Sequence, residues 1–361
     1  MDRPTVHDLA RHANVSLATV DRVLNGRPGV REQTVARVRK AIDDLGYSRD
    51  ANAATLARKK PYRFVFLLPK SSTRFMANLI HAIQETARSG MAARTVLDVV
   101  QAPMVTPHDV SGALGKLDRL EMDGLAIMAP ETPTVRDAVI KLREAGVEVV
   151  PIISDLPGAG CGHFVGIDNL AAGRTAAGLL GRFCAPSGGD MLVVGGFVNA
   201  RDGIERRLGF DQVMRAQFPD FHVRPTAEGR DIAERVEQIV LRALRTDNPV
   251  AGIYLAGAGT SGLVRALRQA ADAPTGLHGL SRPFVIAHEL TAVTRDALRD
   301  GLIDAVISQD VGHIARSTLR VLRAQKDQLP ISATQERIRI DIFTTENMPS
   351  PKGQKTGGPD I

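Results

Sequence analysis

The sequence predicts a small all-α head followed by a large α/β domain made of two similar lobes. Three observations indicate this fold class. Apolar residues recur at helical spacing up to about Tyr47, and beyond residue 62 apolar runs alternate with amphipathic stretches. The chain of 361 residues is also too long for one ordinary domain. A modular protein with more than one packed core is therefore expected.

Three short helices fit the head. Their apolar positions are Val6, Leu9, Ala10 and Ala13, then Val20, Val23 and Leu24, then Val35, Val38, Ile42 and Leu45. Thr5 is placed to cap the first helix and Ser16 the second, and Gly46 is a usual stop for the third. The turn over residues 13–15 is as short as a helix-turn-helix requires.

The rest of the chain alternates candidate strands with candidate helices. The strands are Arg63–Leu68, Arg94–Val99, Gly124–Met128, Glu148–Ile153, Met191–Val194, Val250–Leu255, Pro283–Ala287 and Ala305–Ser308. The helices are Phe75–Ser89, Val135–Ala145, Ala171–Phe183, Ile204–Gln217, Ile232–Leu244 and Gly262–Ala271. This alternation implies parallel sheets covered by helices on both faces. It restarts near Gly189, which predicts two lobes with a ligand site between them.

The positive charge is concentrated in the head. Residues 1–60 hold 12 Lys/Arg and 7 Asp/Glu, a net charge of +5, whereas the remaining residues hold 34 and 33. A basic head on a nearly neutral body is the footprint of a protein that binds a polyanion. An unpaired solvated surface is the alternative explanation of the charge alone.

The second helix of the head is the candidate DNA reader. If Val20, Val23 and Leu24 face the core, the opposite face presents Leu17, Ala18, Asp21, Arg22 and Asn25. Arg pairs with guanine in the major groove and small apolar side chains contact the thymine methyl, so Arg22 is the leading base contact beside Leu17 and Ala18. Ser16, Thr19 and Asn25 suit phosphate oxygens. A helical hairpin that packs on a partner protein is the alternative.

Composition excludes several classes of protein. The longest apolar stretches are far shorter than the roughly 20 residues of a membrane-spanning helix, and the polar N-terminus lacks the apolar core of a secretory signal. Cys161 and Cys184 form no Cys-x-x-Cys pair, which fits a reducing compartment. We therefore expect a cytoplasmic protein without catalytic residues, metal or cofactor.

The head resembles the lactose-repressor (LacI) family throughout residues 5–59. The matching motifs are VSLATVDRVLN, a third helix led by valine, LGY and NAATLA. Family members usually carry Ser where this chain has Asp21. The resemblance implies that Thr5 also contacts DNA and that Asp50–Arg58 is a hinge helix, with Asn52, Ala53 and Leu56 on the operator and Leu56 as a minor-groove wedge. Packing of Leu56 on the body is the alternative.

Residues 62–345 resemble, more loosely, the two-lobed periplasmic-binding-protein-like (type I) fold that the family uses as a sugar sensor. The landmarks are DGLAIMAP, VVPIISDLPG, FVGIDNLAAGRTAA, IERRLGF, FVIAHELT and DAVISQD. Expected domains are a DNA-binding head (1–48), a hinge helix and linker (49–61), a ligand-binding and dimerisation domain (62–345) and a disordered tail (346–361). The expected partners are palindromic operator DNA, a sugar, sugar acid, polyol or sugar phosphate, and a second copy in a dimer or tetramer.

Some of the candidate ligand residues follow from the same resemblance and others from the needs of sugar recognition, and ordinary surface or hinge polarity is the alternative for them. Asp155, Arg206 and Gln309 match positions that face the ligand, Phe75 is a candidate platform for a sugar ring, and His288 or Glu289 enters from the second lobe. At Gly257 the family often has Asn or Asp. This loss suggests an acidic or phosphorylated ligand bound to the amides of residues 257–260 at a helix N-terminus.

Two rival functions are less consistent with the sequence. Gly257-x-Gly259-x-x-Gly262 fits a dinucleotide fingerprint, but the required acidic residue about 20 positions on is absent and the motif lies late in the chain. A solute-binding protein for carbohydrate uptake would share the large fold, but the basic helical head and the absence of a signal argue against it. The favoured interpretation is a DNA-binding transcriptional regulator, a repressor, controlled by a sugar-like effector.

Overall fold

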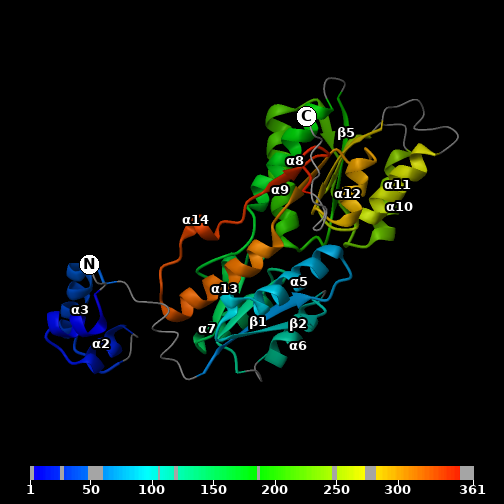
Figure 1. The fold of residues 1–361 in the computed structure, drawn as a ribbon. Coiled ribbons are helices and arrows are strands. Elements are labelled where there is room, and N and C mark those ends of the chain that lie inside the picture. Colours follow the sequence, from blue (N-terminus) through cyan, green and yellow to red (C-terminus); the bar gives the residue numbers. More distant parts are fainter. Residues whose placement is uncertain are drawn as a thin grey trace, which may run out of the picture. The chain divides into compact units, whose positions relative to one another are not determined.

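The structure is a computed structural model, and it describes residues 4–24, 28–47, 60–104, 106–117, 121–184, 188–245, 250–272 and 282–349. The chain divides into two compact units, Met1–Lys60 and Pro61–Ile361, which are described separately below (Figure 1). The predicted hinge lies almost entirely outside the described residues, as does the tail beyond residue 349.

The head contains the three predicted helices, α1 (Val6–His12), α2 (Leu17–Leu24) and α3 (Glu32–Leu45). The Thr5 side chain accepts from the amide of Asp8 and forms a capping box with it. The Ser16 hydroxyl accepts from the amide of Thr19 at 3.2 Å. Gly46 ends α3 with a left-handed φ of 57°. All three predicted helix ends are confirmed.

A small core holds the head together. Leu9, Val20 and Val38 are at most 1% exposed and come from α1, α2 and α3 respectively. The other predicted core residues are buried or partly buried around them, except Val6, which is 38% exposed. Val6 is the first residue of α1 and lies before the residues that pack against α2 and α3, so its predicted burial is wrong.

The first lobe of the large unit has a parallel four-stranded sheet in the order β2 (Thr95–Ala102), β1 (Tyr62–Pro69), β3 (Gly124–Ile127), β4 (Glu148–Pro151). Phe64, Phe66 and Leu68 point to one face of β1 and pack with α5 (Arg74–Arg88) and α13 (Val311–Asp327). Val65 and Leu67 point to the other face, with α6 (Pro107–Leu117) and α7 (Pro133–Glu144). Both faces are therefore covered, as predicted. A 3-10 turn, η1, spans Gly90–Ala92.

The second lobe has a larger sheet. Its strand order is β11 (Asp341–Phe343), β10 (Ala305–Ser308), β9 (Phe284–His288), β8 (Val250–Leu255), β5 (Gly189–Gly195), β6 (Phe221–Val223), with β7 (Ala227–Glu228) also on β5. Among these pairs only β10 and β11 are antiparallel in the described part of the chain. On one face lie α8 (Asn169–Phe183) and α9 (Arg201–Gln217), and on the other α10 (Ala233–Leu244), α11 (Thr260–Ala271) and α12 (Ala292–Arg299).

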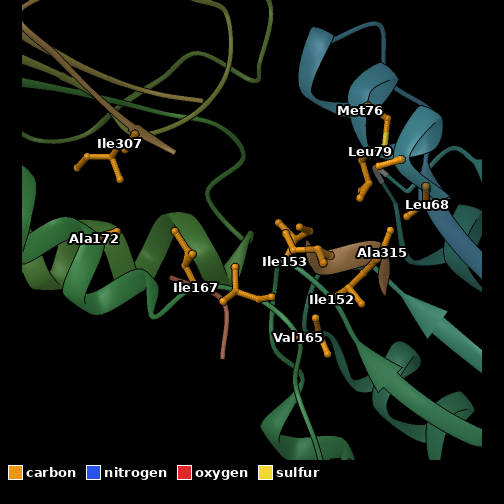
Figure 2. Close-up of a cluster of buried hydrophobic side chains, with 14 of the residues drawn as sticks. Leu68, Met76, Leu79, Ile152, Ile153, Val165, Ile167, Ala172, Ile307 and Ala315 are labelled. Atoms are coloured by element: carbon orange, nitrogen blue, oxygen red, sulfur yellow. The ribbon is translucent and has the colours of Figure 1, made fainter. Parts of the chain in front are cut away.

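The chain passes between the lobes at three places. It leaves β4 for α8 through the 3-10 turn η2 (Pro157–Ala159), leaves β10 for α13, and returns from α13 through α14 (Ala333–Glu336) to β11. One apolar cluster accompanies these crossings. Figure 2 shows Leu68, Met76 and Leu79 of the first lobe, then Ile152, Ile153, Val165 and Ile167 of the first crossing, then Ala172 and Ile307 of the second lobe. The core is thus continuous across the crossings.

The predicted strands and helices are all present, with Val250–Leu255 and Ala305–Ser308 matched residue for residue. The predicted restart is confirmed, because β5 begins at Gly189. Prediction missed α6, α12, α13 and α14, and the short strands β6, β7 and β11. None of the helices in the described ranges is both long and apolar enough to cross a membrane.

Candidate functional site

The outward face of α2 is the candidate DNA-reading surface. Val20 is 1% exposed and points to the core, whereas Leu17 is 44% exposed and Ala18, Asp21 and Arg22 are exposed with it. The orientation predicted from helical spacing is therefore confirmed. In the described part of the chain the Arg22 guanidinium has no hydrogen bond or ion pair, so its five donors are available to a groove.

The remaining predicted DNA contacts fall into two groups. Ser16 and Thr19 lie at the start of α2 with their hydroxyl oxygens 2.9 Å apart, and the Thr5 hydroxyl donates to Asp8 Oδ2 at 2.7 Å. These hydroxyls also stabilise the helix starts, so contact with phosphate remains a prediction for them. Asn25, Asn52, Ala53 and Leu56 lie outside the described residues.

Arg206 is the centre of the candidate effector site. It lies on α9 with 5% of its surface exposed. Its Nε donates to Asn169 Oδ1 on α8 at 2.9 Å, and its Nη1 donates to the carbonyl oxygen of Ala256 after β8 at 2.8 Å. Its Nη2 lies 3.8 Å from Asp202 Oδ2, one turn earlier on α9. A buried guanidinium is thus held at the carboxyl ends of the strands, where open α/β sheets bind ligands.

Three predicted residues at the carboxyl ends of β9 and β10 interact with this guanidinium or with one another. Gln309 Nε2 donates to Glu289 Oε1 at 2.8 Å, and Arg206 interacts electrostatically with both Glu289 and His288. His288 Nε2 lies 2.8 Å from the Tyr254 hydroxyl. Burial, reinforced by Arg206, lowers the pKa of His288 well below its usual range, so its ring is neutral.

Some polar atoms of these residues have no partner. His288 and Gln309 are each 4% exposed, yet His288 Nδ1 and Gln309 Oε1 make no hydrogen bond with any residue in the described ranges. Ser154, which follows β4 and is also 4% exposed, has an unpartnered hydroxyl as well. Buried polar atoms are almost always paired, because leaving one unpaired costs about 1–3 kcal/mol. A ligand with several hydrogen-bonding groups would satisfy them.

The first lobe contributes from the loops after β3 and β4. Asp155 accepts from the amide of Leu156 at 2.7 Å and lies close enough to Glu205 of α9 to raise the pKa of that carboxyl, an effect secondary to burial. Glu131 Oε2 pairs with Arg201 Nη1 at 2.6 Å, which joins the loop after β3 to the start of α9. The strand ends of the two lobes therefore meet at this site.

The other predicted effector residues are placed as follows. Phe75 is half-buried near the start of α5, packed against the core. Gly257 follows β8, and a Cβ there would lie 2.5 Å from the amide nitrogen of Gly196 and 2.9 Å from Asp231 Oδ1. The predicted anion on the amides of residues 257–260 is wrong for Ala258, because its N–H donates to Asp231 Oδ1 at 2.7 Å.

The glycines of the dinucleotide-like fingerprint serve helix packing. A Cβ at Gly262 would lie 1.8 Å from the carbonyl oxygen of Ala233, and one at Gly259 would lie 2.6 Å from Val236 Cγ2. Both contacts are with α10, so these glycines allow α10 and α11 to approach closely. Packing accounts for this motif without a dinucleotide.

Sequence reasoning missed four polar residues of this site. Asp202 carried a signal, because it lies four residues before Arg206 on one helix face. Asn169 and Tyr254 are ordinary members of a helix and a strand, and Asp231 lies in a loop. Their roles depend on contacts between segments 27 to 50 residues apart.

Glu289 makes protein stability depend on pH. Burial raises its pKa to about 7, while hydrogen bonds from Gln309 and the charge of Arg206 act in the opposite direction. Since the ordinary value in an unfolded chain is about 4.3, the folded state holds this proton more tightly. We expect the contribution of Glu289 to the free energy of unfolding to fall as pH rises from about 4.5 to 7. Glu289→Gln should remove this fall and be more stable than the wild type at pH 8.

Urea unfolding at pH 5 and pH 8 measures this effect. Glu144→Gln, at an exposed position at the end of α7, is the control and should give the same difference from wild type at both pH values. A Glu289→Gln variant with the same behaviour as this control would contradict the prediction.

Comparison with known proteins gives a family match for each of the two units. Residues 64–328 match the family described as periplasmic binding protein domain, and residues 5–50 match the family described as bacterial regulatory proteins, lacI family. Catabolite control protein A of Priestia megaterium is 33% identical over 146 residues, which is 40% of this chain and 42% of that protein. HTH-type transcriptional regulator pepR1 of Lactobacillus delbrueckii subsp. lactis is 29% identical over 151 residues, 42% of this chain and 44% of that protein.

These matches therefore span less than half the length of either curated relative. An ABC transporter solute-binding protein from Burkholderia graminis, solved in complex with D-arabinose, has a TM-score of 0.70 at 21% identity and covers 81% of this chain and 99% of its own. This likeness shows the fold of the large unit. The chain belongs to the periplasmic binding protein domain family, and its head, over residues 5–50, matches the family of bacterial regulatory proteins described as lacI.

Proposed function

We propose that this chain is a sequence-specific transcriptional regulator, a repressor, that binds operator DNA through α2 and a sugar or sugar-like effector at the Arg206 site. It acts in the cytoplasm as a homodimer, because one head buries too little surface for tight binding and two heads match a palindrome. The proposal rests on two features found together in one chain. Arg22 lies on an exposed helix face without a partner among the described residues, and a buried polar network lies at the strand ends of a two-lobed fold.

The effector class is supported by the donors and acceptors of the site. Arg206 presents a buried guanidinium with the partly buried carboxyl groups of Asp202 and Glu289 around it. Gln309 and His288 add polar atoms that have no partner within the described residues. Several converging polar groups in an otherwise apolar surrounding are what recognition of a polyhydroxylated molecule requires. Binding alters DNA affinity only if the effector prefers one arrangement of the lobes.

The direct test is selection of operator sequences from a palindromic duplex library, followed by Arg22→Ala. We expect Arg22→Ala to weaken binding to the selected operator by about 1–3 kcal/mol per half-site and to relax preference at one base pair. Effector binding should stay unchanged, because the head and the effector site lie in different compact units. Fluorescence anisotropy with operator and scrambled duplexes measures the loss.

Arg39→Ala is a matched control, because Arg39 is an exposed arginine of α3. It removes the same charge but should reduce affinity for operator and scrambled DNA to a similar extent. If the wild-type protein selects no sequence, or if Arg22→Ala and Arg39→Ala have the same effect on sequence preference, the proposed reading helix is wrong.

Carbohydrate uptake is the second candidate, because the large unit has the fold of a sugar-bound solute-binding protein. Uptake gives no role to the exposed face of α2. A protein that binds a sugar tightly but retains no duplex at any salt concentration would favour this second function.

A further inference from the structure

In the second sheet, the direction in which successive strands are added reverses between β5 and β8. From β5 the order continues outward to β6, whereas from β8 it continues outward to β9, β10 and β11. Ligands of open α/β folds bind outside the carboxyl ends of the strands at such a switch point. In this chain β5 ends at Gly195, followed by Gly196, and β8 ends at Leu255, followed by Ala256 and Gly257.

A single carboxylate fills this switch point. Asp231 Oδ1 accepts from the amide of Ala258 at 2.7 Å, and it would lie 2.9 Å from a Cβ added at either Gly196 or Gly257. Neither glycine can therefore carry a side chain without displacing Asp231. The polar group that position 257 lacks is supplied instead from the loop before α10.

The backbone that carries this carboxylate is strained. Arg230 has a φ of 54° and Asp231 a φ of 58°, so two consecutive residues with side chains adopt the left-handed conformation. Such strain costs of order 1–3 kcal/mol per residue and is concentrated at ligand sites. The loop thus holds Asp231 in a conformation that its own residues do not favour.

The charges around Asp231 do not balance. Burial raises the pKa of Asp231 and the hydrogen bond from the Ala258 amide lowers it; the charge of Asp202 raises this pKa further, and the charge of Arg206 lowers it. Arg206 also faces Glu289 and already donates to Asn169 and to the Ala256 carbonyl. One guanidinium is therefore shared by three carboxyl groups, and an anionic ligand would increase the repulsion.

The buried polar atoms that lack a partner within the described residues indicate which groups a ligand would have to supply to this site. Gln309 donates through Nε2 to Glu289, which leaves its Oε1 as a buried acceptor without a donor. The unused lone pairs of Asp202 and Asp231 are acceptors too. Hydroxyl and ammonium groups are donors, so either would satisfy these oxygens.

We propose that Asp231, together with Asp202, binds hydrogen-bond donors of the effector and thereby selects a sugar-like ligand that carries no negative charge. This inference rests on the proposed function and narrows it, because sugar acids and sugar phosphates are excluded as effectors. Asp231 is the residue that determines this specificity.

The test uses the full-length protein and compounds matched on one scaffold. D-glucose, D-glucosamine, D-glucuronate and D-glucose 6-phosphate differ in charge, and the same set is extended to galactose, mannose and ribose scaffolds. Thermal shift assays identify binders and calorimetry measures their Kd. We expect every binder to be neutral or amine-bearing, and we expect Asp231→Asn to weaken the tightest of them at least tenfold.

Two further variants separate ligand binding from the hydrogen bond between Asp231 and the Ala258 amide. Asp231→Asn keeps an oxygen for the Ala258 amide, so its ligand-free Tm should stay close to that of the wild type, whereas Asp231→Ala loses that acceptor and should lower the Tm. Glu234→Gln removes a carboxylate of α10 whose side chain is 73% exposed, and it should leave Kd unchanged.

The inference is overturned if anionic compounds bind as tightly as neutral ones, if no neutral or amine-bearing compound binds, or if Asp231→Asn binds with wild-type Kd. Operator binding is measured on the same preparations. Loss of all sequence preference in the wild type would reject the proposed regulator function, whereas a sequence-specific protein with an anionic effector would reject only the role of Asp231.

Discussion

Replacing Arg206 with alanine is expected to abolish the response to the effector while sequence-specific DNA binding persists. The guanidinium is 5% exposed and joins α8, α9 and the end of β8 through Asn169 and the Ala256 carbonyl. Its removal takes away the only buried arginine or lysine among the described residues, and it leaves Asn169 Oδ1 and the Ala256 carbonyl oxygen without this donor. Since a hydrogen bond to a charged group contributes about 1.5–3 kcal/mol, we also expect the large unit to lose about 3 kcal/mol of stability.

Arg207→Ala is the matched control for this prediction. Arg207 is the next residue of α9, and its guanidinium also has partners, with Nε 2.8 Å from Asp211 Oδ1 and Nη1 2.7 Å from Thr226 Oγ1. These partners lie away from the Arg206 network, so Arg207→Ala should keep the effector response. Anisotropy of labelled operator with increasing effector measures both variants, and circular dichroism checks that they are folded. A normal response from Arg206→Ala would mean that the effector site is elsewhere.

The head could be predicted almost completely because its determinants are local. Helix spacing, the caps at Thr5 and Ser16 and the stop at Gly46 all lie within a few residues of the elements that they define. The longer strands of both sheets could be predicted as well, because the apolar run that marks each strand is also local. The missed strands β6, β7 and β11 are only two or three residues long and lack fully buried side chains, so they leave no such run.

The arrangement of the candidate effector site could be predicted only in part, because its geometry depends on contacts between distant segments. Arg206 and Gln309 were predicted from their motifs to face an effector, and in the structure both interact with Glu289. Asp231 was missed because its position depends on Gly196 and Gly257, which approach it only when β5 and β8 pair. The absence of a side chain at position 257 suggested an anionic ligand, whereas the structure has a carboxylate of the chain at that place.

Gly173→Ala is expected to have the largest effect on stability. A Cβ at Gly173 of α8 would lie 1.9 Å from the carbonyl oxygen of Arg206, and a Cβ at Gly209 of α9 would lie 2.0 Å from that of Leu170. The two helices thus touch through their backbones at both glycines. A backbone oxygen cannot rotate away as a side chain does, so α8 and α9 must separate, and we expect a loss of about 3 kcal/mol or more in urea unfolding.

Gly115→Ala tests whether the close approach, and not helical glycine itself, is responsible. Gly115 lies within α6 and a Cβ there meets nothing within 4 Å, so alanine should stabilise the protein by about 0.5–1 kcal/mol. If alanine lowers the free energy of unfolding at position 173 and raises it at position 115, the difference comes from the helix that packs against Gly173. Because the clashing oxygen belongs to Arg206 itself, Gly173→Ala should also weaken effector binding, although its side chain touches no ligand. A stable Gly173→Ala protein with normal effector affinity would show that the two helices do not pack this closely.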